Sequence, residues 1–333
     1  MSFAKLTGNH VVRSRLQRMV ASGHTPPSLL FTGPEGVGKL AAAVSTAKAL
    51  NCVGTPQTPG DACDVCRSCL RIERGDYADV RQIRPGGKGG QVTAPDVRPV
   101  VAESPYRPFE GKKRVYIFEE AHRMNPTAAN MLLKTLEEPP PWTLLILVTA
   151  HETALLPTLV SRCRKIRFLP LMLEEVVKQL TQDHDLSRKD AWLAAAVSRG
   201  SLSRALVTET EAVEALREEA LRLASVPAEG ASRSRMLPWA DELSRHSELV
   251  PLLRLLLALA RDLACAAGGG TAAQSDIARR LEVLSERMPL PVWLEAYRRV
   301  EQALYDIEVR YANKRITLEQ LLLGLEDLDR DAR

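Results

Sequence analysis

The sequence predicts an α/β domain with a mostly parallel sheet, followed by a region made only of helices. Over the first 169 residues, short apolar runs alternate with segments of helical periodicity, and a glycine-rich turn follows the first run. After Pro170 the strand-like runs stop, and Leu, Ala, Arg and Glu recur at helical spacing to residue 333. The change in pattern at this proline therefore predicts a boundary between two structural classes.

Five segments are the expected strands. Three of them, residues 28–32, 115–118 and 144–148, are apolar runs; residues 80–83 are a further candidate, and residues 166–168 alternate between apolar and polar. Short continuous apolar runs are typical of parallel strands that are buried on both faces. Residues 38–50 and 127–136 have helical composition, and the second segment ends before three consecutive prolines, which cannot continue a helix.

Composition and length predict a multidomain globular protein. The chain is 45% hydrophobic and 26% charged, which is ordinary for folded domains. We expect three domains, at residues 1–169, 170–208 and 209–333. With 45 basic and 41 acidic residues, the charge permits a nucleic-acid contact but does not require one.

The N-terminal segment lacks the apolar core of a signal peptide, and no apolar run is long enough to span a bilayer. We therefore expect a cytoplasmic protein without a membrane contact. Structural disulfides are then not expected. Cys163 and Cys265 stand apart from the other cysteines and are expected to be buried as small apolar residues.

The glycine-rich turn at residues 33–39 matches the phosphate-binding loop pattern G-x-x-x-x-G-K, and it joins an expected strand to an expected helix. Gly33, Gly36 and Gly38 let backbone N–H groups turn inward around phosphate oxygens, and the helix N-terminus favours negative charge. Lys39 would reach the β- and γ-phosphates. These residues are candidates to bind a nucleotide such as ATP or ADP.

Both positions that would hold Mg²⁺ depart from the usual pattern. A Ser or Thr normally follows the loop lysine, but here the residue is Leu40, whose side chain cannot bind a hard cation. After the apolar run 115–118 come Glu119 and Glu120, where an Asp and a Glu are usual. Phosphoryl transfer depends on charge neutralised by metal, so we expect weak or absent ATP hydrolysis.

Four cysteines follow the loop helix. Cys52, Cys63, Cys66 and Cys69 have the spacing C-x10-C-x2-C-x2-C, which predicts a structural zinc site with four thiolate ligands. The segment has few apolar residues, so the metal would supply much of its folding energy. An iron–sulfur cluster is the second interpretation. A redox pair is disfavoured because three cysteines crowd together.

The order of phosphate loop, four-cysteine insert and acidic strand end resembles the AAA+ clamp-loader family of bacterial DNA polymerase III. Two further strings strengthen the resemblance: AANMLLKTLEEPP at residues 128–140, and Ser-Arg-Cys at residues 161–163. It is strong over about residues 3–210 and weaker to the end, where residues 312–325 resemble the last helix of the family's oligomerisation domain.

The resemblance implies an AAA+ RecA-like domain at 1–169, a helical lid at 170–208 and a helical collar at 209–333. It implies that Arg162 is an arginine finger that acts in trans on a neighbouring ATP site. It places Thr149 at the sensor 1 position, and Arg204 near the sensor 2 position. The implied partners are gamma/tau and delta subunits in a hetero-pentamer, with the sliding clamp and primed DNA reached through that complex.

Three alternatives remain open. A gamma/tau motor subunit shares the insert and the Ser-Arg-Cys string, but it needs its own hydrolysis site. A stand-alone AAA+ ATPase of DNA metabolism should keep both magnesium positions. A zinc-dependent nucleic-acid-binding module would carry more aromatic residues, whereas this chain has 5%. The basic residues Arg67, Arg71 and Arg74 could still contact phosphates or form a solvated helix face.

Overall fold

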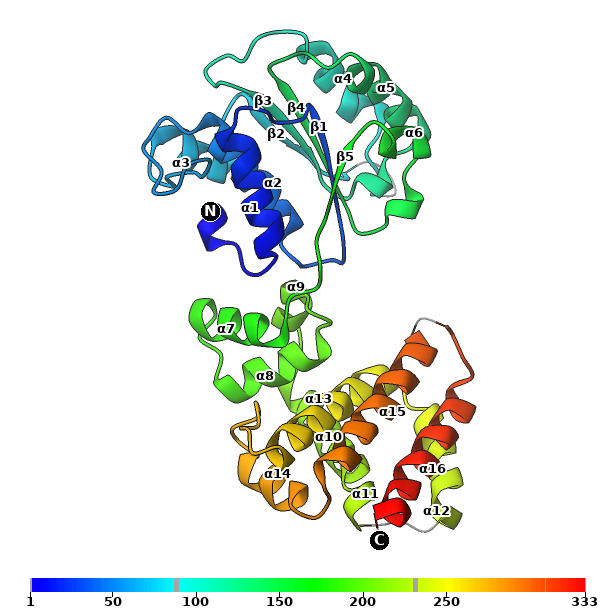
Figure 1. Cartoon of the computed structure of the whole chain (residues 1–333). Helices are drawn as coiled ribbons and strands as arrows, with labels where there is room; N and C mark the ends of the chain where they lie inside the picture. The colour runs from blue at the N-terminus through cyan, green and yellow to red at the C-terminus, as the bar shows by residue number, and fades with distance from the viewer. Residues whose placement is uncertain (1, 87–89, 230–232, 309, 333) are drawn as a thin grey trace. The chain divides into compact units, whose positions relative to one another are not determined.

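The computed structural model describes residues 2–86, 90–229, 233–308 and 310–332. The chain divides into two compact units, Met1–Glu175 and Val176–Arg333 (Figure 1). The first unit contains all the strands among the described residues, and the second contains only helices. The predicted α/β domain followed by a helical region is confirmed.

The first unit is built on a five-stranded sheet in the order β2-β3-β4-β1-β5, with every neighbouring pair parallel. The strands are β1 (Ser28–Thr32), β2 (Val80–Ile83), β3 (Arg114–Phe118), β4 (Thr143–Thr149) and β5 (Arg164–Arg167). All five expected strands are present. The last one begins two residues earlier than the expected segment, because Arg164 and Lys165 pair with β1 although they are exposed.

Helices cover both faces of this sheet (Figure 1). They are α1 (His10–Ala21), α2 (Lys39–Asn51), α3 (Arg67–Arg74), α4 (Ala94–Glu103), α5 (Pro126–Glu137) and α6 (Pro157–Val160), with short 3₁₀ turns at Phe3–Lys5, Ala121–Arg123 and Glu152–Ala154. Alternate strand residues face opposite sides. Leu29 and Phe31 pack with residues of α1 and α2, whereas Leu30 packs with residues of α4 and α5.

The second unit is a bundle of helices. They are α7 (Leu173–Asp183), whose first residues lie in the first unit, and α8 (Arg188–Val197), α9 (Leu202–Leu206), α10 (Thr210–Ala224), α11 (Val226–Glu229), α12 (Arg233–Ser244), α13 (Leu249–Ala267), α14 (Ala278–Ser285), α15 (Leu290–Glu308) and α16 (Lys314–Ala332). The apolar helix α13 packs against α10 and α15, and α12 packs against α16. The expected lid corresponds to α7–α9. Its separation from the following helices as a domain of its own stays a prediction.

Two isolated cysteines test the burial expectation. Cys163 is half-buried, and its thiol pKa is raised to about 11 by burial. Cys265 is exposed near the end of α13, so the prediction that it is buried was wrong. Helical composition alone does not show which face of an apolar helix meets solvent. Among the described helices, none is long and apolar enough to span a bilayer.

Candidate nucleotide and metal sites

The residues predicted to handle phosphate meet at the carboxyl edge of the sheet. Gly33 follows β1 and Glu119 follows β3, while Thr149 is the last residue of β4. The register pairs Thr32 with Thr149 and Phe118 with Leu147, so these three strands end at nearly the same level. Ligands of open parallel sheets bind at this edge. The sheet order therefore brings together a loop and side chains that lie far apart in sequence.

The loop between β1 and α2 requires its glycines. Gly33, Gly36 and Gly38 have φ values of 139°, 70° and 88°. These are conformations that L side chains rarely adopt. At Gly33 a Cβ would also lie 2.3 Å from the backbone oxygen of Phe168. The loop thus has the backbone freedom that a phosphate cradle needs, and α2 begins directly after it.

Lys39 lies folded against this loop. Its side chain is buried, and Nζ donates hydrogen bonds to the backbone oxygens of Gly33, at 2.6 Å, and of Pro34. Burial lowers the pKa of Lys39 to about 8, against the opposing effect of the Glu35 carboxylate. The ammonium is therefore held at the loop and carries its charge less readily than an exposed lysine.

Leu40 occupies the position where a hydroxyl would bind Mg²⁺. Its side chain is half-buried and packs against the apolar cluster that α2 forms with the sheet. A cavity of about 10 Å³ lies beside the loop and is lined by residues that include Leu6, Val37 and Phe168. This is about the space that one water needs. The space beside the loop at Val37 and Phe168 is therefore small, whereas Pro34, Glu35 and Gly38 of the loop itself are exposed.

The two acidic residues after β3 are each paired with an arginine of the same chain. Glu119 Oε1 lies 2.7 Å from Arg84 Nε, and Glu120 Oε2 lies 2.7 Å from Arg123 Nε. The Glu119 carboxylate is mostly buried, whereas Glu120 is exposed. Sequence analysis missed both arginines. Arg84 follows β2, and only the pairing of β2 with β3 shows that it reaches Glu119.

Thr149 is buried at the end of β4 and its hydroxyl is already engaged. The His151 N–H donates to Thr149 Oγ1 at 3.0 Å, and His122 Nδ1 lies 3.2 Å from the same oxygen. The His122 and His151 rings pack edge to face, with centroids 4.8 Å apart. Burial and the neighbouring His151 lower the pKa of His122. These histidines were also missed, because each is a lone residue in sequence.

Arg162 lies at the opposite edge of the sheet. Ser28, the first residue of β1, donates its hydroxyl to the Arg162 backbone oxygen at 2.7 Å. Gly33 lies beyond the other end of β1, about 15 Å away at the usual rise of a strand. The guanidinium is about one-third exposed and contacts Glu137 Oε1 at 2.7 Å. Arg162 therefore lies far from the phosphate loop of its own chain.

Arg204 lies in α9, in the second unit, and is exposed. The loop belongs to the first unit, so the sensor role of Arg204 toward it stays a prediction.

The four cysteines of the insert converge as their spacing predicts. Their sulfurs all lie within 4.8 Å of one another, with Cys52 and Cys66 4.0 Å apart and Cys63 and Cys69 4.0 Å apart. A tetrahedral zinc with Zn–S bonds of about 2.3 Å has S–S edges of about 3.8 Å. A Cβ on Gly54 would lie 2.7 Å from Cys63 Sγ, so only glycine fits there. The four thiols thus fit a closed tetrahedral metal site.

Ionic contacts fix this insert to the rest of the first unit. The Lys48 ammonium, on α2, lies 2.6 Å from Asp64 and 2.5 Å from Glu73. Burial opposes its charge, but the two carboxylates outweigh it and raise the pKa of Lys48 above its usual range. Asp61 accepts hydrogen bonds from the backbone N–H groups of Phe3 and Ala4. The insert is therefore anchored both to the loop helix and to the N-terminal segment.

Comparison with known proteins gives a consistent set of relatives. Residues 8–172 match the family model described as "DNA polymerase III, delta subunit". The chain is 33% identical over 218 residues to DNA polymerase III subunit tau of Escherichia coli, covering 64% of this chain and 33% of that protein. It is 33% identical over 178 residues to subunit delta' of Bacillus subtilis, covering 54% of this chain and 50% of that protein.

The matched region thus spans a third to a half of the length of these two relatives. Among solved structures, a DNA polymerase III gamma-subunit-related protein of Thermotoga maritima aligns over 95% of this chain and 99% of that chain. It is 16% identical with a TM-score of 0.40.

Proposed function

Because the chain belongs to the clamp-loader family of DNA polymerase III subunits, we propose that it is the delta-prime subunit of that complex. In this role it joins gamma/tau and delta subunits in a hetero-pentamer that loads the sliding clamp on primed DNA. Its contribution is that of a stator: it performs little chemistry itself and supplies Arg162 to a neighbouring ATP site.

The position of Arg162 is the observation that carries this proposal. It lies at the amino edge of the sheet, whereas the phosphate loop lies at the carboxyl edge. An arginine that is exposed on the side away from its own loop can stabilise transition-state charge only on another subunit. A guanidinium suits this role because it stays charged and binds phosphate oxygens through two N–H groups. Its contact with Glu137 would have to open for this.

The state of the chain's own site supports a stator over a motor. Leu40 packs against the core instead of offering a hydroxyl, and Glu119 is neutralised by Arg84. With both Mg²⁺ positions compromised, the chain lacks the charge neutralisation that phosphoryl transfer needs. We therefore place gamma/tau motor function and stand-alone ATPase function behind the delta-prime assignment. The loop glycines and Lys39 leave binding of ATP or ADP open without hydrolysis.

The four-cysteine site fits a structural role in the same proposal. Cys52, Cys63, Cys66 and Cys69 would hold zinc as four thiolates with no open position for substrate. The site ties the segment after α2 to α3, beside the sheet rather than at its carboxyl edge. We assign no step of ATP hydrolysis to it.

The test is an ATPase assay of the assembled complex. The chain alone should show negligible turnover. Mixed with gamma/tau, delta, clamp and primed DNA, it should support DNA-stimulated hydrolysis. The proposed pentamer contains three gamma/tau subunits, each with an ATP site, and Arg162 would serve one of them. Replacing Arg162 by Ala should therefore lower the rate by at least about one third, because an arginine finger contributes about 10³-fold or more to hydrolysis at its site.

The matched control is Arg98→Ala, which removes an exposed arginine of α4 in the same unit. It should leave the rate unchanged. Incorporation of each variant is checked by gel filtration of the complex. An Arg162→Ala complex that assembles and hydrolyses ATP at the normal rate would refute the finger in trans. Robust turnover by the chain alone would favour the motor alternative.

A further inference from the structure

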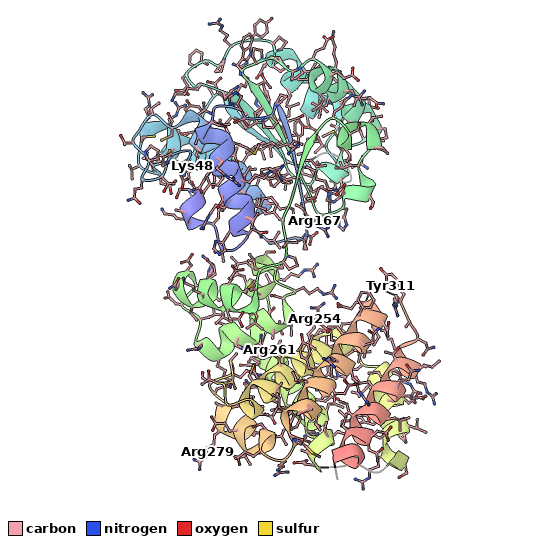
Figure 2. The ribbon with its side chains drawn as sticks, viewed as in Figure 1. Lys48, Arg167, Arg254, Arg261, Arg279 and Tyr311 are labelled. Carbon is pink, nitrogen blue, oxygen red and sulfur yellow. The ribbon has the colours of Figure 1, made fainter. Side chains whose placement is uncertain are left out.

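A groove in the second unit has no role in the proposed ATP chemistry. It has a volume of about 700 Å³ and lies between the end of α10, the short α11 and the first turns of α14. All of its lining residues fall between Leu221 and Arg287, within that unit. Figure 2 shows Arg279 at the outer side of this unit. The groove is therefore a feature of one folded body.

Four arginines line the groove, and two of them have no acidic partner. Arg280 lies 3.0 Å from Glu218 and Arg287 lies 3.2 Å from Glu229. Among the described residues, no carboxylate pairs with Arg222 or Arg279, and both are exposed. Two exposed guanidiniums that line one groove from different helices favour an anionic ligand.

The start of α14 adds to the positive charge. Arg279 and Arg280 occupy its first turn, which contains no acidic residue, and Ile277 provides no side-chain cap. A helix N-terminus already carries partial positive charge, so arginines there are unfavourable without an anion nearby. The two arginines therefore destabilise the first turn of α14, where this helix lines the groove.

The groove also presents apolar surface. Val283, which is 52% exposed, lines the groove together with the buried residues Leu221 and Leu284. Asp276 and Glu229 interrupt the basic lining. A nucleic-acid strand offers evenly spaced phosphates and would meet these carboxylates, whereas a peptide can place neutral or apolar residues beside them.

We propose that this groove binds an acidic peptide segment of a partner protein, with carboxylates at Arg222 and Arg279 and one large apolar side chain on Val283. Such a segment satisfies both features of the groove, the unpaired guanidiniums and the exposed apolar side chain of Val283. The inference does not depend on the assignment of Arg162 or on nucleotide binding.

The test is fluorescence polarisation with the full chain and the labelled peptide Asp-Glu-Asp-Leu-Phe-Glu-Asp. Binding should weaken at least about tenfold in the double variant Arg222→Ala/Arg279→Ala, because two charge-assisted contacts are lost. Changing Leu and Phe of the peptide to Ser should weaken it similarly. Arg235→Ala, an exposed arginine of α12 outside the groove, should bind like the original chain.

Thermal melts confirm that each variant is folded; since Arg222 and Arg279 are exposed, the double variant should melt normally. A second variant, Val283→Ser, removes the apolar contact and should also weaken binding. The proposal fails if the double variant binds the peptide as tightly as the original. It also fails if a single-stranded DNA oligonucleotide binds in an Arg222- and Arg279-dependent manner while the peptide does not, because the groove would then be a phosphate site.

Discussion

At the residue scale, burial at the glycine-rich loop changes the pKa of Lys39. Its pKa is lowered to about 8 by burial, so folding disfavours its charged form. Below pH 8 the lysine is protonated in both folded and unfolded chains, and the full penalty of burying the charge applies. Between pH 8 and about 10.5 the folded chain releases the proton while the unfolded chain keeps it, so the penalty falls.

This gives a prediction about stability and pH. Replacing Lys39 by Met removes the charge and keeps most of the volume. The melting temperature of the original chain should therefore rise relative to that of Lys39→Met as pH increases from 7 to 10. Thermal melts of both proteins at each pH measure the difference between their melting temperatures. Other titrating groups affect both proteins equally, so their contributions cancel in this difference. A difference that stays constant, or that moves the opposite way, would show that the loop does not perturb this lysine.

Some residues of the candidate sites could be predicted from the sequence, and others could not. The glycines, Lys39 and the four cysteines were identified because their spacing follows from local backbone geometry. Sequence analysis missed Arg84, Glu137 and His122. Their partners Glu119, Arg162 and Thr149 lie far from them in sequence and meet them only because of the strand order and the turns of the chain. Arg84 and Glu119 are 35 positions apart and meet only because β2 lies beside β3. A sequence motif therefore predicts the loop, but it does not predict that Arg84 pairs with the acidic residue Glu119 beside it.

At the element scale, α2 links the glycine-rich loop to the four-cysteine insert. The helix begins at the loop with Lys39 and ends next to Cys52. Along it, Lys48 reaches two carboxylates of the insert, and its side chain is almost fully buried. Removing a buried partner leaves charges unpaired, which usually costs more than the pair itself contributes.

Lys48→Met should therefore lower the free energy of unfolding by about 2 kcal/mol, less than the ~3–5 kcal/mol typical of fully buried pairs. The lower figure follows from the Glu73 side chain, which is 49% exposed and partly solvated. Urea titration measures the change. Lys134→Met, an exposed lysine of α5, serves as the control and should change stability by less than about 0.5 kcal/mol. Equal losses in both variants would mean that Lys48 contributes nothing specific.

The proposed zinc site predicts that the four-cysteine insert needs a bound metal to stay folded. Replacing Cys63 and Cys66 by Ser should abolish stoichiometric zinc, measured by mass spectrometry of the purified protein. It should also lower the melting temperature, because little apolar surface remains to hold the segment together. Iron in place of zinc would favour the cluster interpretation. A metal-free variant that melts at the original temperature would contradict the structural role.

Elements were easier to predict than their ends. The three central strands, β1, β3 and β4, have a core of continuous apolar residues because helices cover both faces of the sheet, whereas the edge strands β2 and β5 carry exposed polar residues. The start of β5 at Arg164 was not visible, since exposed arginine and lysine there pair only through their backbones. Hydrophobic periodicity reports burial, so strand ends that lie in solvent escape it.

At the scale of the whole molecule, the chain consists of two compact units with different contents. The first unit holds the loop, the four-cysteine insert and Arg162, and the second is a helical bundle with its own core around α13. Both are of ordinary domain size, so we expect each unit to fold alone. In the proposed stator, the first unit supplies the finger and the second supplies oligomerisation.

That division can be tested by expressing residues 1–175. The fragment should unfold cooperatively and retain zinc, because its sheet, both helical layers and all four cysteines are present. It should not enter a complex with gamma/tau and delta in gel filtration, since the proposed collar is missing. The full chain is the positive control. If the fragment joins the complex, the collar does not hold the assembly together. If the fragment fails to fold, the compactness of the first unit depends on the helices that follow it.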